Sequence, residues 1–387
     1  MYDNAIYIYK CLYVLTLLLF VFSGKKLAKA KNIKQYWKWA IIPIVMYVVF
    51  AGLRFGRGGD YNIYYFEFEN LKDNINNNDR FEYLFVFYVR LFHLIGLSYK
   101  FFIAFNSFLL ITLFLYVCSS CKKILPYALL LFFWEIRPAE NLIRWYIAVI
   151  PFIIMVSNLN RKKYLFAFIL GGAAVFIHSG FYPMILFTFF VFCFQNYLIP
   201  YRIALIIFFI CILIGSSKIF LFFAPYLSFL NINERSGRYI EAFQDIVNGD
   251  FGIMGIRQMS WSTQIRVFIA YSFPIICIPT LVKKGYISKF IANLFILGVI
   301  FSPIMNQVEI LSRYSQTLLL FSIVVSGYSY YNSFTSLERM DYYAVLSFIC
   351  YVFPILSLLL SEIPWNLTLY VWDSNGWGYL PINYLKE

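Results

Sequence analysis

A chain of 387 residues with 61% hydrophobic and 22% aromatic side chains, and only 13% charged ones, lies outside the composition of soluble globular domains. A net charge of +13 would suggest a nucleic-acid partner in a soluble protein, but here the lysines lie in short links between apolar stretches, as in cytoplasmic loops of membrane proteins. The composition therefore predicts a polytopic membrane protein and excludes a nucleic-acid partner.

Hydrophobic stretches of the length that a bilayer requires recur along the whole chain. They lie at 5–22, 39–53, 101–118, 124–136, 141–157, 164–179, 181–196, 203–223, 264–282, 290–304, 314–331 and 342–361. The stretch 5–22 has no basic segment before it and no A-x-A site after it, so we expect a retained helix rather than a signal peptide. The pattern predicts an all-α polytopic membrane protein with about twelve transmembrane helices, and residues 1–387 are expected to form a single integral membrane domain.

Basic residues gather in the links that are expected to face the cytoplasm. These links are Lys25 to Lys38, Lys122–Lys123, Arg161–Lys163, Arg202 and Lys283–Lys289. The loops about 54–100, 137–140, 224–262 and 305–313, together with both termini, are then expected in the periplasm. The loop 224–262 carries mixed charges and is expected to form an ordered cap with short interfacial helices, although a solvated loop without a role is the alternative.

Only one crossing can lie between the first periplasmic loop and Lys122, yet both 80–97 and 101–118 are apolar. Glu82, Arg90 and His93 fall on one helical stripe of the first segment, against an aromatic face. We therefore expect 80–97 to form an amphipathic helix that lies in the periplasmic interface.

The seven cysteines and two histidines do not indicate a metal or redox site. Most cysteines lie in apolar stretches, where a thiol behaves as a small hydrophobe. Cys118 and Cys121 form a CxxC at a predicted cytoplasmic helix end, where thiols stay reduced. Neither histidine has other ligands at metal-binding spacing. We expect no cofactor and no metal.

The first loop carries the densest set of candidate site residues. Arg54, Arg57 and Asp60 lie beside glycines that let the backbone approach a ligand, and Tyr61, Tyr64 and Tyr65 follow. An aspartate beside arginines stays ionised and can accept a proton from a hydroxyl. A salt bridge from Asp60 to Arg54 or Arg57 is the structural alternative.

Other candidates lie at further predicted periplasmic edges. Arg137 and Arg144 flank a helix boundary at Pro138, and their charges require an anion, with Glu135 or Glu140 as the structural alternative to a phosphate. His178 and Ser179 end a predicted span, where a structural histidine is the alternative to a catalytic one. The last group comprises Glu234, Arg235, Arg238, Tyr239, Glu309, Arg313 and Tyr314.

Four short motifs together resemble the EpsG-like branch of the Wzy-type O-antigen and exopolysaccharide polymerases. They are RxxxxGDYxxYxxxF from Arg54 to Phe68, Glu82–Tyr83, Arg137 with IRxxIA from Ile143 to Ala148, and FxHS from Phe176 to Ser179. The motifs span about the first half of the chain. Trp145 departs from the pattern, because the family commonly has Gln after this arginine.

The resemblance implies a fold similar to the GT-C glycosyltransferases and a polymerase in the bacterial inner membrane with its active site facing the periplasm. Its partners would be undecaprenyl-pyrophosphate-linked glycans as donor and acceptor, the lipid bilayer, and as candidates a chain-length regulator and a flippase. Asp60 is the first candidate for the base and His178 the second. The expected pyrophosphate ligands are Arg54, Arg57, Arg137, Arg144, Arg235, Arg238 and Arg313, and the expected sugar contacts are Tyr61, Tyr64, Tyr65, Glu82 and Tyr239.

Two other functions use similar residues. A flippase or transporter of lipid-linked saccharides would need the same arginines but no base, and its site is expected near the bilayer midplane. Another lipid-linked glycosyltransferase or a ligase would share the topology. Because the charges gather at one side, the sequence favours the polymerase.

Overall fold

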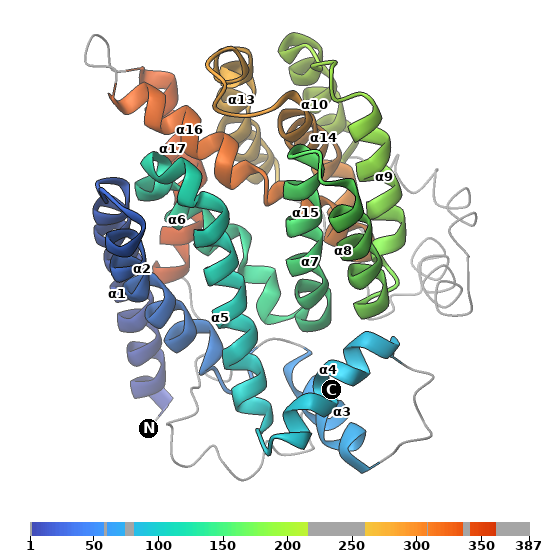
Figure 1. Ribbon diagram of the computed structural model, residues 1–387. Coiled ribbons are helices and arrows are strands. Elements are labelled where there is room, and N and C mark those ends of the chain that lie inside the picture. The colour runs from blue at the N-terminus through green and yellow to red at the C-terminus, as the bar shows by residue number, and fades with distance from the viewer. Residues whose placement is uncertain are drawn as a thin grey trace. The chain divides into compact units, whose positions relative to one another are not determined.

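The computed structural model describes residues 2–57, 60–73, 81–215, 260–307, 309–335 and 341–360, and all regular elements in these ranges are helices (Figure 1). The contacts divide the chain into two compact units, which are described separately. Unit 1 comprises residues 1–190 and 355–387, and unit 2 comprises residues 191–354. The expectation of a single integral domain stays a prediction.

Unit 1 is built mainly from the helices of the N-terminal half. They are α1 Tyr2–Ala28, α2 Ile33–Tyr47, the π-helix η1 Val48–Gly52, α3 Tyr61–Asp73, α4 Tyr83–Leu94, α5 Tyr99–Cys118, the 3₁₀ turn η3 Ser119–Ile124, α6 Leu125–Glu135, the 3₁₀ turn η4 Arg137–Glu140, α7 Ile143–Asn160, α8 Tyr164–Ile177 and most of α9 Phe181–Cys193. Among them α7 packs against α8, and α1 packs against α2 and α6.

Unit 2 contains the helices that follow α9. They are α10 Tyr201–Gly215, α13 Trp261–Lys283, α14 Lys289–Met305, α15 Glu309–Leu319, α16 Ser322–Thr335 and the greater part of α17 Tyr342–Leu360. In this unit α14 packs against α10 and α15, and α13 packs against α10 and α16.

Several helices are long and apolar enough to cross a membrane. Within the described ranges these segments are Ile6–Ala28, Tyr99–Glu135, Ile143–Asn160, Trp261–Lys283 and Tyr342–Leu360. Every predicted hydrophobic range contains helix, but the remaining apolar helices are shorter. The structure thus agrees with a multi-pass membrane protein, and the number of about twelve crossings stays a prediction.

One predicted span is divided in two. The sequence predicts a single helix over 314–331, but α15 ends at Leu319 and α16 begins at Ser322. Around the break, backbone N–H groups bond carbonyls three residues back, from Leu320 to Thr317 and from Phe321 to Leu318. These shorter-range hydrogen bonds interrupt the α-helix. Hydropathy does not predict the break, because the sequence is apolar on both sides of it.

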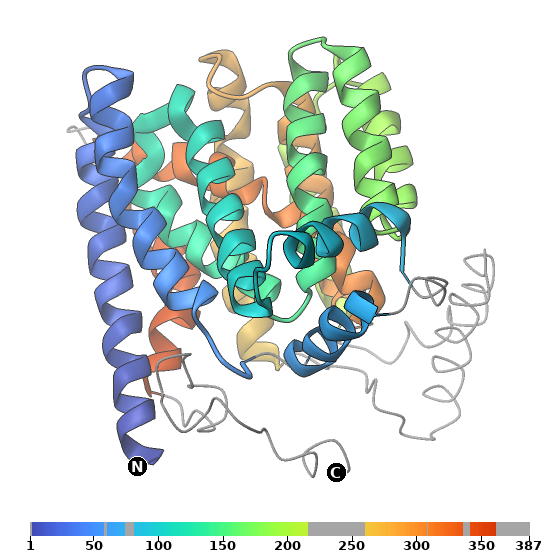
Figure 2. The ribbon, with the colours of Figure 1, turned by 60° about the horizontal axis from the view of Figure 1, so that its bottom comes forward.

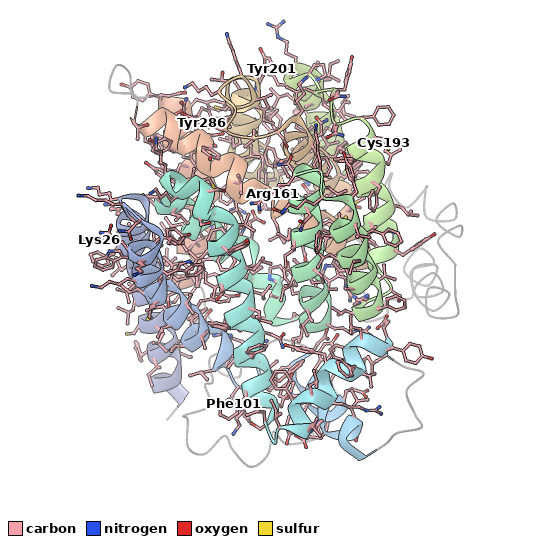
Figure 3. All side chains as sticks on the ribbon, viewed as in Figure 1. Lys26, Phe101, Arg161, Cys193, Tyr201 and Tyr286 are labelled. Carbon is pink, nitrogen blue, oxygen red and sulfur yellow. The ribbon has the colours of Figure 1, made fainter. Side chains whose placement is uncertain are left out.

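The two ends of unit 1 differ in their basic residues. Lys122 donates to the carbonyl of Ala30, so the link after α1 and the turn after α5 lie at the same end, as their lysines predict. Figure 3 shows Lys26 and Arg161 toward this end and Phe101 toward the opposite one. We call the end of unit 1 that carries Lys26, Lys122 and Arg161 the lysine end. Residues 53–57, α3 and α4 lie at the opposite end (Figures 1 and 2).

Helix α4 lies crosswise to α5 instead of running alongside it (Figures 1 and 2). Its 12 residues extend about 18 Å, far less than a bilayer core of about 30 Å. Phe85, Val89 and Phe92 are buried, whereas Tyr83 and Leu94 are exposed. The helix is thus shorter than a bilayer core is thick, and the expectation that 80–97 lies in the periplasmic interface stays a prediction.

Candidate functional site

The candidate site begins where α2 ends in the π-helix η1. The Arg54 guanidinium, with the residue only 3% exposed, donates to the carbonyls of Ala51, of Arg57 at 3.2 Å and of Glu140 at 3.0 Å. Gly56 permits this tight turn because its φ of 64° is a value that favours glycine. Burial lowers the pKa of Arg54, and the Glu140 carboxylate opposes this shift.

The second arginine of the loop is fixed in a similar way. Arg57 donates to the Phe50 carbonyl at 2.7 Å and forms an ion pair with Glu140 Oε1 at 2.6 Å. Its guanidinium also lies over the rings of Phe50 and Tyr9, at 4.6 and 5.3 Å from the centroids. Arg54 and Arg57 are predicted from the sequence as pyrophosphate ligands. In the structure, both guanidiniums donate instead to acceptors of the protein itself.

The 3₁₀ turn η4 holds the loop at both ends. The Glu140 carbonyl accepts a hydrogen bond from Arg54, and the Glu140 carboxylate accepts one from Arg57. The next residue, Asn141, accepts the backbone N–H of Asp60 on Oδ1 at 2.9 Å. This contact places the candidate base beside the turn that also carries Arg137. The sequence indicates Glu140 only as an alternative partner of Arg137 and Arg144, and no pattern in it predicts the contacts of Glu140 with Arg54 and Arg57.

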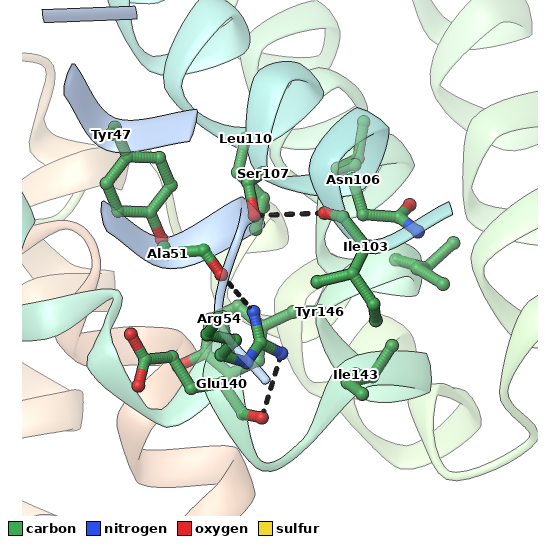
Figure 4. A pocket seen from close by; sticks show the side chains of 13 residues that line it. Tyr47, Ala51, Arg54, Ile103, Asn106, Ser107, Leu110, Glu140, Ile143 and Tyr146 are labelled. Carbon is green, nitrogen blue, oxygen red and sulfur yellow. Dashed lines mark hydrogen bonds between the residues drawn. The ribbon is translucent and has the colours of Figure 1, made fainter. Parts of the chain in front are cut away.

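Figure 4 shows Arg54 and Glu140 at a small pocket between η1, α5 and α7. Tyr47, Asn106, Ser107 and Tyr146 supply its polar lining, and isoleucines of α5 and α7 supply an apolar wall. The hydroxyl of Tyr146 is buried there without a hydrogen-bond partner. From the first loop, Arg54 lines this pocket.

A second junction joins three segments through Glu82, the residue before α4. Its Oε2 forms an ion pair with Arg144 of α7 at 2.7 Å, and its Oε1 accepts the N–H and hydroxyl of Ser179 at 2.9 and 2.8 Å. Arg144 pairs with Glu82, and the alternative partners Glu135 and Glu140 are therefore wrong for this residue. These contacts connect the Glu82–Tyr83 motif with the IRxxIA motif through Arg144 and with the FxHS motif through Ser179.

His178 follows α8 in an extended conformation, and its Nδ1 accepts the backbone N–H of Gly180 at 3.0 Å. Its ring lies edge-on to Trp145, with centroids 5.0 Å apart. Trp145 also packs against Phe181, at 4.4 Å between centroids. Trp145, which departs from the motif pattern, thus packs between His178 and Phe181.

The tyrosines of α3 differ in exposure. Tyr61 is 3% exposed and packs against Tyr99, with ring centroids 5.2 Å apart, whereas Tyr65 is 42% exposed. Burial raises the pKa of Tyr61 to about 12, and nearby Arg54 opposes the shift. Tyr64 is half-buried and lies 6.4 Å from the Phe85 ring. Tyr65 is therefore the most exposed of the three tyrosines.

Arg137 is exposed, unlike the arginines of the first loop. Its guanidinium lies 5.9 Å from the Trp134 ring, and within the described part of the chain it has no ion-pair partner. Arg144 is less exposed, and its Nε is buried without a hydrogen-bond partner. Arg137 lies in η4 and Arg144 in the first turn of α7, but of the two only Arg144 contacts Glu82 among the described residues.

The remaining predicted residues lie elsewhere. Arg313 is in α15 of unit 2, whereas the site residues described above belong to unit 1. Arg235, Arg238 and Tyr239, together with the rest of the predicted loop 224–262 up to residue 259, lie outside the described residues. Among described residues, no group of three or more His, Cys, Asp or Glu side chains could hold a metal ion.

The site of unit 1 combines a carboxylate, a histidine and two guanidiniums at the end opposite the lysine end. A carboxylate can accept a proton from a hydroxyl, and guanidiniums can stabilise a phosphate leaving group. The arrangement therefore suits transfer of a group from a phosphate ester to a hydroxyl.

Comparison with known proteins gives one positive result. The model of the EpsG family matches residues 37–370, which is most of the chain. No curated protein and no solved structure matches the chain.

Proposed function

Because the chain belongs to the EpsG family, we propose that it polymerises undecaprenyl-pyrophosphate-linked oligosaccharide repeat units into O-antigen, capsule or exopolysaccharide. The family is associated with polysaccharide polymerase-type glycosyltransferases. The observation that carries the proposal is the convergence of the Asp60 loop, the η4 turn and the His178 turn at the same end of unit 1. This end would face the periplasm of a bacterial inner membrane, because the lysine end fits the cytoplasm.

In the proposed reaction, a hydroxyl of the acceptor repeat unit attacks the anomeric carbon of the donor glycan. The bond between that carbon and the phosphate oxygen breaks, and the electron pair stays on the undecaprenyl pyrophosphate. The hydroxyl proton passes to the Asp60 carboxylate. The contact from Asn141 to the backbone N–H of Asp60 supports this role, since it fixes the backbone of the base.

Four arginines of unit 1 have two different roles in this proposal. Arg54 and Arg57 are bound by carbonyls and by Glu140, so they shape the loop. Arg137 is exposed and Arg144 is held from one side by Glu82, so these two would bind pyrophosphate oxygens. Planar guanidinium favours such bidentate contacts. Arg235, Arg238 and Arg313 remain proposed further ligands.

Sugar contacts would come from Tyr65 and Tyr64, since Tyr61 is buried in the helix packing. Glu82 would act through Arg144 and Ser179 rather than on a sugar hydroxyl, because both of its oxygens already accept hydrogen bonds. Tyr239 stays a proposed sugar contact. A chain-length regulator and a flippase remain proposed partners.

The direct test reconstitutes the purified chain in liposomes with a radiolabelled lipid-linked repeat unit. We expect a ladder of polymers on the lipid carrier and release of undecaprenyl pyrophosphate in equal number to the bonds formed. Movement of intact lipid-linked units across the bilayer without new glycosidic bonds would identify a flippase. Transfer of one glycan to a different acceptor without a ladder would identify another glycosyltransferase or a ligase.

A further inference from the structure

Arg266 is an arginine inside a candidate membrane span of unit 2. It lies in the second turn of α13, and the first turn of that helix contains no acidic residue. Within the part of the chain that the structure describes, its guanidinium forms no hydrogen bond and no ion pair, and it lies 5.7 Å from the centroid of the Phe353 ring. Because arginine does not lose its proton, a charge in such a helix requires an anion or water.

Helix α17 carries Phe353 on a face that the rest of the protein does not cover. The opposite face packs on α13, where the buried Ser347 hydroxyl donates to the Ala270 carbonyl at 2.8 Å. The uncovered face consists of large apolar and aromatic side chains at helical spacing, namely Tyr342, Leu346, Ile349 and Phe353, all of them exposed. Since α13 and α17 are both long and apolar enough to span a bilayer, this face suits contact with lipid.

The position of Arg266 along α13 places its side chain near one surface of a bilayer. Lys283 ends the helix, and Arg266 lies about 25 Å from it at a rise of about 1.5 Å per residue, close to the thickness of a bilayer core of about 30 Å. Side chains on a helix tilt toward its N-terminus, so the guanidinium extends away from Lys283. Lysines favour the cytoplasmic side, so Arg266 lies toward the side where basic residues are less common.

We propose that Arg266 binds the phosphate of an anionic phospholipid, whose acyl chains lie along the exposed face of α17. A guanidinium can bind two phosphate oxygens at once, and the Phe353 ring supports it from one side. The headgroup is expected to carry a net negative charge, because a headgroup ammonium would add a second cation where no described acidic residue pairs with Arg266. This inference goes beyond the proposed function and does not depend on it.

Native mass spectrometry of the full chain can count the lipids that stay bound. The protein is released from micelles that contain equal amounts of phosphatidylglycerol and phosphatidylethanolamine with the same acyl chains. We expect the wild type to retain phosphatidylglycerol in preference, and Arg266→Gln to bind it about 10-fold more weakly or worse, as on loss of a charged hydrogen bond. Arg266→Lys should lie between the two, because an ammonium keeps the charge without the planar fork.

Arg202→Gln is the matched control in the same unit. Arg202 also lies over an aromatic ring, 5.8 Å from the centroid of Tyr201, but its Nε donates to the Tyr201 hydroxyl at 3.2 Å. The control should retain as much phosphatidylglycerol as the wild type. Equal loss in Arg202→Gln and Arg266→Gln would show a general effect of net charge and would overturn the proposal.

Thermal unfolding provides a second measurement that begins with the wild type alone. Phosphatidylglycerol should raise the unfolding temperature of the wild type more than phosphatidylethanolamine does, because a ligand of the folded state stabilises it. This difference should vanish in Arg266→Gln. Without added lipid, Arg266→Gln should unfold no earlier than the wild type, since it removes no ion pair of the described chain.

Three outcomes would contradict the site. The first is equal retention of the two phospholipids by the wild type, and the second is equal retention of phosphatidylglycerol by the wild type and Arg266→Gln. The third is displacement of the bound lipid by inorganic pyrophosphate or by undecaprenyl pyrophosphate at the same concentration, which would indicate a simple anion site or a substrate site. None of these measurements requires polymer formation, so they remain decisive if the proposed function fails.

Discussion

Arginine side chains in unit 1 are used in two physical ways. Arg54 and Arg57 are buried, and carbonyls at the end of η1 accept several of their N–H groups. Such carbonyls lack intrahelical partners, so a guanidinium there serves as a helix cap. Arg137 is exposed and keeps its donors for other partners. A conservative substitution should therefore affect stability at the first kind of position and activity at the second.

Replacing Arg57 by lysine should lower stability, whereas replacing Arg137 by lysine should lower activity. Lysine cannot match the planar fork that joins the Phe50 carbonyl to Glu140, so Arg57→Lys should cost about 1–3 kcal/mol. Arg137→Lys keeps the charge but loses bidentate phosphate contact, and polymer formation should fall roughly 10-fold or more. Thermal unfolding in detergent and the polymer assay measure the two effects.

Arg161→Lys is the matched control, because Arg161 is exposed at the lysine end of the same unit. It should change neither property. The division of roles would be refuted by an Arg137→Lys variant that unfolds early, or by one that polymerises at the wild-type rate.

The ion pair between Glu82 and Arg144 provides a second prediction at this scale. Their side chains are 13% and 15% exposed, so Glu82→Gln leaves a largely buried guanidinium without its counter-charge. A fully buried pair loses about 3–5 kcal/mol on removal of one partner, and partial exposure should reduce the cost to about 1–3 kcal/mol. Adding Arg144→Met should restore stability but not activity.

Thermal unfolding of the two single variants and the double variant forms a double-mutant cycle. Additive losses in the double variant would mean that the pair does not couple the segments. Restored polymer formation in the double variant would show that Arg144 has no part in binding pyrophosphate.

At the scale of elements, close approach of η1 to α5 positions the loop. A Cβ atom on Gly52 would lie 2.8 Å from the Cα of Ala104, and backbone cannot move aside easily. The helices therefore meet where η1 turns into the loop of Arg54 and Arg57. A π-helix is rare and is often found at functional sites, which agrees with its place here.

Gly52→Ala should destabilise the protein by about 1–3 kcal/mol, because an added methyl group must push two helices apart. Gly172→Ala in α8 is the control, since a Cβ atom there meets nothing within 4 Å. The control should be neutral or slightly stabilising, because alanine favours helix over glycine. Equal unfolding temperatures for both variants would contradict the close packing.

The orientation of α4 can be tested by cysteine labelling in a background without native cysteines. Tyr83 and Ile95 are 82% and 64% exposed at the two ends of the helix, so the rest of the protein does not cover either side chain. We expect a membrane-impermeant maleimide to label Tyr83→Cys and Ile95→Cys from the same side. Labelling from opposite sides would show that the segment crosses the membrane.

Hydropathy and charge predict the position of almost every helix, because each is a local property of the chain. The division between α15 and α16 escapes them, since both halves are apolar enough to continue as one helix. The prediction that 80–97 does not cross the membrane comes from counting crossings between lysine-rich links, which is an argument about the whole path rather than about one segment.

At the scale of the whole molecule, the sequence predicts which residue types gather at which end but not which of them touch. Arg144 and Glu82 are 62 residues apart, and Asp60 and Asn141 are 81 apart. No local pattern reports such pairs, because they form only when helices that are distant in sequence pack together. Glu140 is the clearest case, since its contacts to the first loop give no signal in the turn that carries it.

The central claim is that Asp60 is the base of a polymerase site, and the rate of bond formation in Asp60→Asn tests it most directly. The asparagine keeps the size of the side chain, and its backbone N–H can still donate to Asn141. We expect single-turnover polymerisation in liposomes to fall by about 10²- to 10⁴-fold, with unchanged unfolding temperature and unchanged binding of the lipid-linked repeat unit. Asp60→Glu should retain more activity than Asp60→Asn. A near-normal polymer ladder from Asp60→Asn would contradict the account.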